Sequence, residues 1–389
     1  MRRTCETPPA GAAGPGGSPL VGPEESRHQM SEATTAQTPR FRSVLDRIVS
    51  FRPSRAMPAP TGPACPLAAN ESPYGPPAAV VEAVRREALR VNRYPDNGCA
   101  ELIAGISARH GVPEECVAVG CGSAGVAQML LAAVAEPGDE VLYAWRSFEA
   151  YPILTRLSGA TAVETPLDDG VHDLAAMADA ITDRTRLIFV CNPNNPTGTV
   201  VAEDALRTFL DRVPADCLVV LDEAYREYVR DSGTPDGLEL ASGRPNVVVL
   251  RTFSKAYGLA ALRVGFMVGH PLVAGAIRKA YLPFSVNSVA QAAAVAALGA
   301  ERELMARVET TIGERERVGA ALTAHGLTVP ASEANFLWLP LGERAAAFGE
   351  HCVRAGVLVR TFAGDGVRVS IGSPAENDAL LAVAAAFGH

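Results

Sequence analysis

The sequence predicts an α/β fold, with a mostly parallel central sheet that carries helices on both faces and a smaller α+β domain. Three observations predict it. Short runs of Val, Ile and Leu alternate with helical stretches through the middle of the chain, as in strands buried on both faces. Polar motifs follow several of these runs directly, where ligands of such sheets bind. After residue 285 the pattern changes to a long Ala-rich helix followed by short strands.

The 389 residues are enough for two globular parts. Residues 1–40 are rich in Pro, Gly, Ser, Thr and Glu and lack hydrophobic periodicity, so they are predicted to be a disordered tail. Residues 41–90 are expected to form an N-terminal segment that joins the small domain. Residues 91–285 form the predicted large domain, and residues 286–389 form the small C-terminal α+β domain.

Composition excludes several classes of function. The net charge is −8 and no run of Lys or Arg forms a basic stripe, so nucleic acid is not an expected partner. No apolar run is long enough to span a membrane, and the N-terminus lacks the apolar core of a signal peptide. The eight cysteines are scattered without metal-ligand spacing. We therefore expect no metal site, and reduced thiols in a cytoplasmic protein.

Polar side chains follow two apolar runs in the middle of the chain. The stretch "LVVLDEAYREY" brings Asp222 and then Tyr225 out of a predicted strand. In "FVCNPNNPTG", prolines and a glycine form a rigid turn that aims Asn195 above the sheet. Each motif alone also has an ordinary explanation, because Asp often caps a helix and Asn, Pro and Gly favour turns.

A third strand end, "TFSKAYGLAALR", contains a lysine between hydroxyl side chains and an arginine. Most single lysines are solvated surface charges. A partly buried lysine, however, loses much of its preference for the charged form and becomes a nucleophile able to form a Schiff base. The motif residues are Thr252, Ser254, Lys255 and Arg263.

Together the three strand ends predict a pyridoxal phosphate site. Lys255 would form the imine, and Asp222 would keep the pyridine nitrogen protonated so that the ring withdraws electrons. Asn195 and Tyr225 would hydrogen-bond the phenolic oxygen of the ring. The two hydroxyls and the forked Arg263 would hold the phosphate.

Two further stretches fit the same site. "AVGCGSAGVAQMLLAAVA" runs from a strand through a Gly-rich turn into a helix, so Ser123, Ala124 and Gly125 can offer backbone N–H groups to a phosphate. "AWRSFEAYP" places Phe148 after another strand, where its ring would stack on the cofactor. Gly-rich turns and core aromatics are common, so these motifs count only beside the others.

The order of the motifs carries a family resemblance. "NESPYGP", "RYPDNG", "GCGS", "NPNNPTG", "DEAY", "TFSKAYGLAALRVG", "EANF" and "VRVSIGSPAEND" follow one another as in fold-type I aminotransferases of the histidinol-phosphate aminotransferase branch. Within that branch, "VNRYPDNGC" and "WRSFEAYP" resemble the actinobacterial aromatic amino-acid (phenylalanine) aminotransferases. The resemblance covers residues 41–389. It implies the PLP-dependent transferase fold, a homodimer with active sites at the subunit interface, and the roles given above.

The resemblance adds five residues. Tyr94 resembles the tyrosine that reaches the cofactor phosphate of the neighbouring subunit. Arg368 resembles the arginine that clamps the substrate α-carboxylate, and Arg360 matches the arginine that contacts the distal phosphate of histidinol phosphate. Tyr74 and Asn335 match residues at the substrate site.

The resemblance implies an aminotransferase that moves the amino group of an aromatic L-amino acid to a 2-oxo acid such as 2-oxoglutarate by a ping-pong mechanism. Lys255, Asp222 and Tyr225 would be its catalytic residues. Histidinol-phosphate enzymes commonly carry a Tyr in place of Phe148 and acidic residues after the Gly-rich Ser, and these departures weigh against that donor. Histidinol-phosphate transamination remains the alternative, followed by decarboxylation of a phosphorylated amino acid and by a non-catalytic cofactor-binding regulator.

Overall fold

The structure, a computed structural model, describes residues 41–48 and 64–387. The tail predicted for residues 1–40 lies outside the described residues. A short 3-10 helix covers Ser43–Arg47. The boundaries predicted for the two domains stay predictions.

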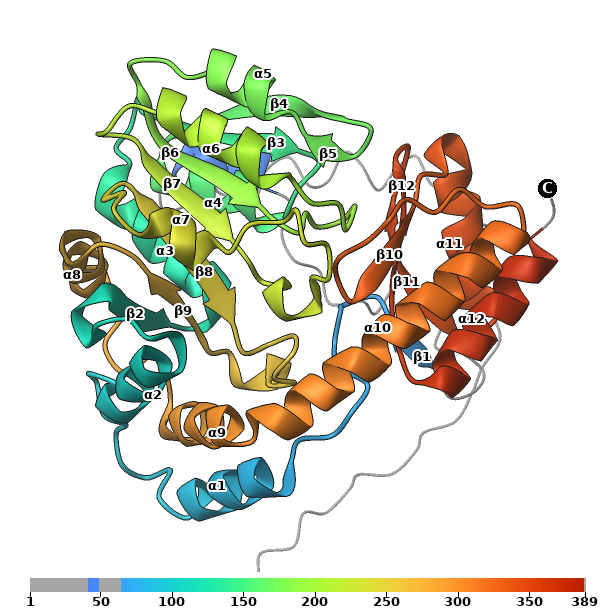
Figure 1. Cartoon of the computed structure of the whole chain (residues 1–389), viewed down its shortest axis with the longest axis horizontal. Helices are drawn as coiled ribbons and strands as arrows, with labels where there is room; N and C mark the ends of the chain where they lie inside the picture. Colours follow the sequence, from blue (N-terminus) through green and yellow to red (C-terminus); the bar gives the residue numbers. More distant parts are fainter. Residues whose placement is uncertain (1–40, 49–63, 388–389) are drawn as a thin grey trace, which may run out of the picture. The chain divides into compact units, whose positions relative to one another are not determined.

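The large sheet has eight strands in the order β2-β9-β8-β7-β6-β3-β4-β5 (Figure 1). Neighbouring strands from β8 to β4 are parallel, whereas β9 and β2 at one edge and β5 at the other are added antiparallel. The predicted α/β class with a mostly parallel sheet is confirmed. The strands are β2 (Val117–Gly120), β3 (Glu140–Trp145), β4 (Thr161–Asp168), β5 (Val171–His172), β6 (Thr185–Cys191), β7 (Leu218–Asp222), β8 (Val247–Thr252) and β9 (Gly265–Val268).

The continuous apolar runs of the central strands reflect burial on both faces of the sheet. In β3, Val141 and Tyr143 pack into one core cluster, while Leu142 and Ala144 pack into another. Successive strand side chains point to opposite faces, so each apolar run supplies two layers of core. One layer is closed by α3 (Gly122–Val134), α4 (Ala150–Ser158) and α8 (Pro271–Lys279), the other by α5 (Leu174–Asp179), α6 (Glu203–Arg212) and α7 (Gly237–Ala241).

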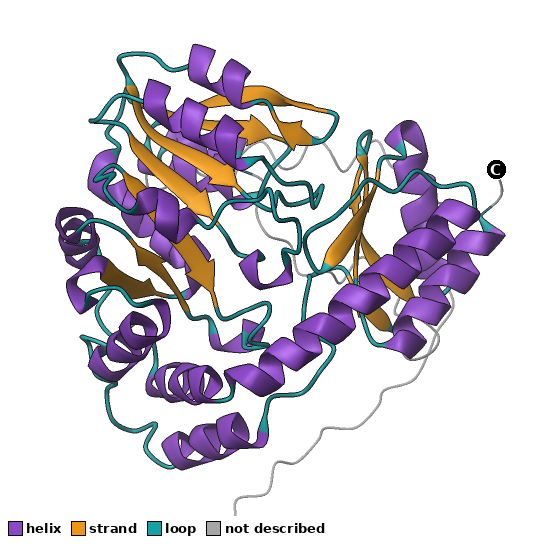
Figure 2. Cartoon of the chain, in the orientation of Figure 1, coloured by secondary structure: helices purple, strands orange, loops and turns teal. Residues whose placement is uncertain are grey.

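A second sheet has four strands in the order β1-β11-β12-β10 (Figure 2). Its strands are β1 (Cys65–Leu67), β10 (Phe336–Leu339), β11 (Val357–Phe362) and β12 (Gly366–Ser370). The helices α10 (Glu301–Ala324), α11 (Ala345–Arg354) and α12 (Pro374–Ala386) contribute to the core cluster of this sheet. Because β1 pairs in parallel with β11, residues from both ends of the described chain build one sheet.

The long Ala-rich helix expected after residue 285 is two helices, which corrects the prediction. α9 (Ser288–Gly299) ends and α10 begins at Ala300, whose backbone leaves the helical region at φ −98° and ψ 13°. Glycine in a helix costs about 1 kcal/mol relative to alanine, so Gly299 is a weak point for continuation. The two helices also have different partners. α9 packs against α1 (Ala78–Ala88) and α2 (Ala100–His110), whereas α10 packs against α12.

The described part of the chain lacks two classes of feature. None of its helices is both long and apolar enough to cross a membrane. Within the same residues, no group of three or more His, Cys, Asp or Glu is arranged to hold a metal ion.

Candidate functional site

A cavity of about 320 Å³ lies at the carboxyl ends of β6, β7 and β8. These strands end at Cys191, Asp222 and Thr252, and all three residues line the cavity. Parallel strands end at the same edge of a sheet, so motifs far apart in sequence meet there. The lining residues are Ala69, Asn70, Glu71, Ser123, Ala124, Phe148, Glu149, Cys191, Asn195, Asp222, Ala224, Tyr225, Thr252, Ser254, Lys255, Ala260, Arg263 and Arg368.

Lys255 lies three residues beyond the end of β8, and its Nζ donates a hydrogen bond to the carbonyl oxygen of Ala69 at 2.9 Å. Burial, and then the neighbouring Arg368 guanidinium, lower the pKa of Lys255 to about 8. A larger fraction of this amine than of an ordinary lysine is therefore neutral near neutral pH, and a neutral amine can act as a nucleophile or a base. The sequence predicted this partly buried lysine.

Asp222 ends β7 in a buried position, with 3% of its surface exposed. Its Oδ2 accepts a hydrogen bond from the Tyr151 hydroxyl at 2.8 Å, while its buried Oδ1 has no partner among the described residues. Burial raises the pKa of Asp222 to about 6. The free oxygen leaves room for one more donor, and a cationic N–H would suit it best.

A wall of hydrogen-bonded side chains lies between the two sheets. It is formed by Tyr225, Asn70, Asn195 and Arg368. Asn70 Nδ2 donates to the Tyr225 hydroxyl at 3.0 Å, and burial raises the pKa of that hydroxyl to about 12. Arg368 on β12 donates to Asn195 Oδ1 and to the Ala68 carbonyl oxygen, both at 2.5 Å. Its Nε is buried without a partner in the described part of the chain. The wall therefore keeps an unused cationic donor beside Tyr225 and Asn195.

The first turn of α3 faces Arg263 across a narrow gap. Gly122, which opens this helix, has φ +72°, and a Cβ placed there would lie 2.5 Å from Arg263 Nη2. Gly265 approaches the same turn so closely that any Cβ would overlap the backbone nitrogen of Ser123. Arg263 Nη1 donates to Ser254 Oγ at 3.3 Å. Glycine at both positions lets backbone N–H groups, a hydroxyl and a guanidinium converge, which is a favourable arrangement for an anion.

Phe148 and Glu149 follow β3 and also line the cavity. The Phe148 ring meets Tyr151 edge-on, with 5.5 Å between ring centroids. Glu149 accepts two hydrogen bonds from Arg360, from Nη2 at 2.6 Å and from Nε at 3.2 Å. Arg360 is thus tied to a carboxylate at the cavity wall.

Five predicted site residues lie outside the cavity lining. Gly125 lies one turn into α3, against Cys121, and Arg360 reaches the cavity only through Glu149. Asn335 Nδ2 donates to the Asn70 carbonyl oxygen at 3.1 Å and so positions a lining residue. Tyr74 lies near α10, where burial and then the Glu314 carboxylate raise its pKa. Tyr94 is 82% exposed and its ring stacks on Phe284.

Sequence reasoning missed Asn70, Glu149 and Tyr151. All three lie inside quoted motifs, because Asn70 opens "NESPYGP" and the other two belong to "WRSFEAYP". Asn70 has a left-handed backbone at φ 54° and is almost fully buried. Asn adopts that conformation more readily than most residues, so an Asn before "ESPYGP" carried a usable signal. Nothing local indicates that Tyr151 reaches Asp222.

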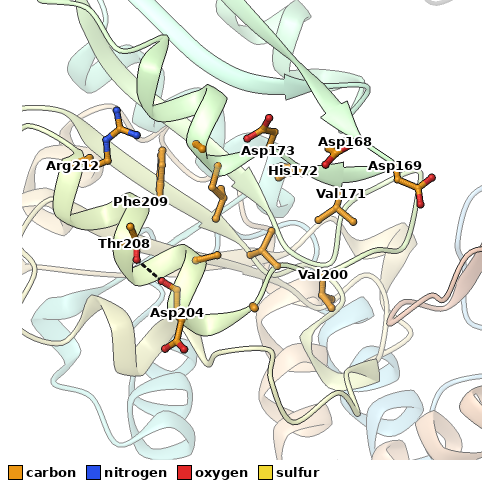
Figure 3. Close-up of a pocket in the computed structure, with 15 residues that line it drawn as sticks. Asp168, Asp169, Val171, His172, Asp173, Val200, Asp204, Thr208, Phe209 and Arg212 are labelled. Carbon is orange, nitrogen blue, oxygen red and sulfur yellow. Dashed lines mark hydrogen bonds between the residues drawn. The ribbon is translucent and has the colours of Figure 1, made fainter.

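A larger cavity of about 720 Å³ lies between the β4–β5 turn and α6 (Figure 3). It is lined by residues such as Asp168, Asp169 and Phe209, and it contains none of the predicted site residues. Its buried His172 bonds through Nε2 to Asn194 Oδ1 at 3.1 Å, one residue before Asn195. Cavity size therefore does not identify the functional site in this chain, whereas the chemistry of the lining residues does.

Comparison with known proteins agrees with this geometry. Residues 64–383 match the family model for aminotransferases of class I and II. An aromatic amino acid aminotransferase of Thermobifida fusca is 60% identical over 349 residues, which cover 90% of this chain and 97% of the relative. A protein of the same name from Streptomyces coelicolor is 58% identical over 351 residues, covering 90% and 98%.

Among solved structures, histidinol-phosphate aminotransferase from Sinorhizobium meliloti in complex with pyridoxal-5'-phosphate aligns with a TM-score of 0.82. It is 27% identical, and the alignment covers 91% of this chain and 100% of the other. The resemblance drawn from the sequence motifs is confirmed, since both the family match and the relatives span most of the chain. This chain belongs to the aminotransferase class I and II family.

Proposed function

We propose that this chain uses pyridoxal 5'-phosphate to transfer the amino group of an aromatic L-amino acid to a 2-oxo acid such as 2-oxoglutarate. The observation that carries the proposal is the pairing of Lys255 and Asp222 in one cavity at the ends of adjacent strands. Relatives that are 52–60% identical and named aromatic amino acid aminotransferases support the aromatic donor.

The residues of the cavity fit the cofactor at its ring. The unpartnered Oδ1 of Asp222 is buried and would accept the proton of a pyridinium nitrogen. Such a cation would also favour the charged form of a carboxylate that burial otherwise opposes. Tyr225 and Asn195 would hold the phenolic oxygen, and Phe148 would stack on the ring.

The opposite end of the cavity fits the phosphate. The proposed phosphate position is surrounded by the α3 N-terminus and by Ser123, Thr252, Ser254 and Arg263. The glycine backbone at 122 and 265 leaves space that a side chain would fill. A ligand with an anionic end and a basic ring requires both this anion site and the Asp222 carboxylate.

The bound cofactor supplies an aldehyde that captures amines and a ring that stabilises a carbanion at the donor's Cα. The chain supplies the proton transfers. Lys255 would hold the cofactor through Nζ, and its amine, whose pKa is lowered to about 8 in the protein without cofactor, would take the donor's Cα proton and return it. Asp222 would hold the proton on the ring nitrogen. Arg368, whose Nε has no partner among the described residues, would orient the donor's α-carboxylate.

We further propose a homodimer with shared active sites. Tyr94 is exposed beside Phe284 in this chain, which suits a residue that completes the site of a neighbouring subunit. The described cysteines are free thiols, which supports a reducing compartment such as the cytoplasm.

The test is a half-reaction on the purified, cofactor-loaded protein without any 2-oxo acid. L-phenylalanine and L-histidinol phosphate are added separately, and the visible absorbance of the bound cofactor is followed. We expect fast loss of absorbance with phenylalanine and little with histidinol phosphate. The opposite preference would assign the chain to histidinol-phosphate transamination, for which the Sinorhizobium meliloti structure is the precedent.

Lys255→Ala is the matched variant. Removing the base should slow the half-reaction by about 10²–10⁴-fold, the usual contribution of a positioned acid–base group. Turnover close to that of the unmodified protein would remove Lys255 from its proposed role.

A further inference from the structure

Two arginines face the same side of the small sheet at the cavity. Arg360 on β11 is the direct cross-strand partner of Arg368 on β12. Side chains at such paired positions lie on one face, and like charges placed there repel each other. Arg368 lines the cavity and is only 7% exposed, so this repulsion acts at the wall that would receive the donor.

The Glu149 carboxylate neutralises the positive charge of Arg360. Both of its carboxylate oxygens accept hydrogen bonds from Arg360, in the forked geometry that suits a guanidinium. Glu149 itself lines the cavity beside Phe148. The ion pair therefore has a net charge of zero, and Glu149 is the member of the pair that belongs to the cavity lining.

The charges of this pair reach the carboxylate clamp. The pKa of Arg368 is lowered by burial in the first place, while the Glu149 carboxylate raises it and the Arg360 guanidinium lowers it. Two charges that act on Arg368 also act on a donor bound to it. With Arg360 neutralised, Arg368 is left to bind the one carboxylate that every amino acid carries.

We propose that Glu149 determines specificity by neutralising Arg360, so that an uncharged distal group is accepted directly, whereas an anionic one, that of the acceptor 2-oxoglutarate included, must displace Glu149 from Arg360. This inference rests on the proposed function and names the residue that sets its donor class. A distal carboxylate or phosphate would meet the Glu149 carboxylate and compete with it for Arg360. An uncharged phenyl ring would not be repelled by the Glu149 carboxylate and would not compete with it for Arg360.

The pair can be tested as a charge series. The wild type has a net charge of 0 at this pair, Glu149→Gln has +1, Arg360→Gln has −1, and the double variant returns to 0. The half-reaction rates per donor concentration are measured for L-glutamate and L-phenylalanine, and their ratio is compared. We expect the ratio to rise about tenfold in Glu149→Gln and to fall about tenfold in Arg360→Gln, each about 1.4 kcal/mol.

The double variant separates charge from shape. Its ratio should return to within about threefold of the wild-type ratio, because the net charge is restored although both side chains are changed. A second readout is binding of glutarate and of 3-phenylpropionate to the cofactor-loaded protein, followed by the cofactor absorbance. Glutarate affinity should follow the same order across the series, and 3-phenylpropionate affinity should not.

Asp365→Asn is the matched control. The Arg146–Asp365 ion pair joins the same two segments, but neither residue is among those that line the cavity. Its loss should leave the glutamate-to-phenylalanine ratio within about twofold of wild type.

Two outcomes would overturn the proposal. One is an unchanged ratio in Glu149→Gln, and the other is an equal loss of both donors, which would make Glu149 merely structural. Failure of the proposed function looks different, because the wild type itself would then not react with phenylalanine. The binding of glutarate and 3-phenylpropionate would still decide the role of Glu149 in that case.

Discussion

At the scale of single residues, Asp222 combines deep burial with an incomplete set of hydrogen bonds. Tyr151 satisfies one oxygen, and the other has no donor among the residues described. A charged group in that position costs stability, a cost that the proposed role of Asp222 at the cofactor ring would explain. The cost should be measurable in the protein without cofactor.

Asp222→Asn should therefore stabilise the cofactor-free protein at neutral and alkaline pH. The folded-state pKa of about 6 lies above the ordinary value of 3.8, so the contribution of Asp222 to stability is full at low pH and is lost as pH rises through about 6. We expect the variant to gain about 1–3 kcal/mol at about pH 8, and the gain to shrink toward zero as pH falls to about 4. Urea unfolding at several pH values measures it.

The control for this experiment is Asp216→Asn, because the side chain of Asp216 is 78% exposed. Asp216→Asn should show no increase in the free energy of unfolding that grows with pH. Equal stability of wild type and Asp222→Asn at every pH would contradict the burial argument.

The sequence predicted the residues whose chemistry is unusual for their local setting, and it missed those that act through partners. Lys255 at the end of an apolar run is conspicuous in any reading of the sequence. These residues contact partners that are distant in sequence. Asn70 bonds Tyr225 across 155 residues, Glu149 bonds Arg360 across 211, and Tyr151 bonds Asp222 across 71. No periodicity encodes such pairings, so only the folded chain shows them.

At the scale of elements, an ion-pair cluster fixes β8 to the segment that follows β7. Arg251 Nη2 bonds Glu223 Oε2 at 2.7 Å and Asp236 Oδ1 at 2.9 Å, and the Arg251 and Glu223 side chains are 7% and 3% exposed. Glu223 directly follows Asp222, and Arg251 lies four residues before Lys255. The cluster therefore holds the two strand ends that carry the key residues.

Arg251→Met should destabilise the fold by about 3–5 kcal/mol, because it leaves the Glu223 carboxylate buried without a cation. Chemical unfolding of the cofactor-free protein gives the difference. Arg317→Met is the comparison, since Arg317 is 41% exposed where it pairs with Glu314 and should cost about 1 kcal/mol or less. Similar losses in both variants would contradict the distinction between the buried and the exposed pair.

The elements that the sequence predicted best are those with local signals. The central strands are continuous apolar runs, and β7 has all five residues buried. β1 and β5 escaped prediction because they have three and two residues and are strands only through their partners. The break at Ala300 escaped as well, since Leu298 and Ala300 on either side of Gly299 both favour helix, and the different packing partners of α9 and α10 decide the outcome.

At the scale of the whole molecule, large apolar side chains are exposed together on two segments. The Tyr94 and Phe284 rings stack at 4.5 Å between centroids, which joins the segments. Such a patch on a soluble chain is typical of an interface with another protein, and it is where we propose the dimer contact. The patch consists of Leu89, Val91, Tyr94, Leu282 and Phe284.

Leu282→Lys should weaken the proposed homodimer, because a charge would be buried at the contact. Sedimentation velocity should show a shift toward monomer, accompanied by loss of the half-reaction with phenylalanine. Leu272→Lys is the control, because Leu272 is 77% exposed on α8, outside the patch, and should leave the association state unchanged. A wild type that sediments as a monomer would refute the dimer.

The parallel pairing of β1 with β11 also bears on how the protein is made. The backbone nitrogen of Asn70 donates to Ser370 Oγ across 300 residues, and the wall of the cavity depends on that contact. During synthesis the large sheet is complete once residue 268 has left the ribosome, about a hundred residues before β12. A nascent chain of that length already carries Lys255 and Asp222, yet it lacks the strand bearing Arg368. The residues proposed to anchor the cofactor are therefore synthesised before the arginine proposed to hold the substrate.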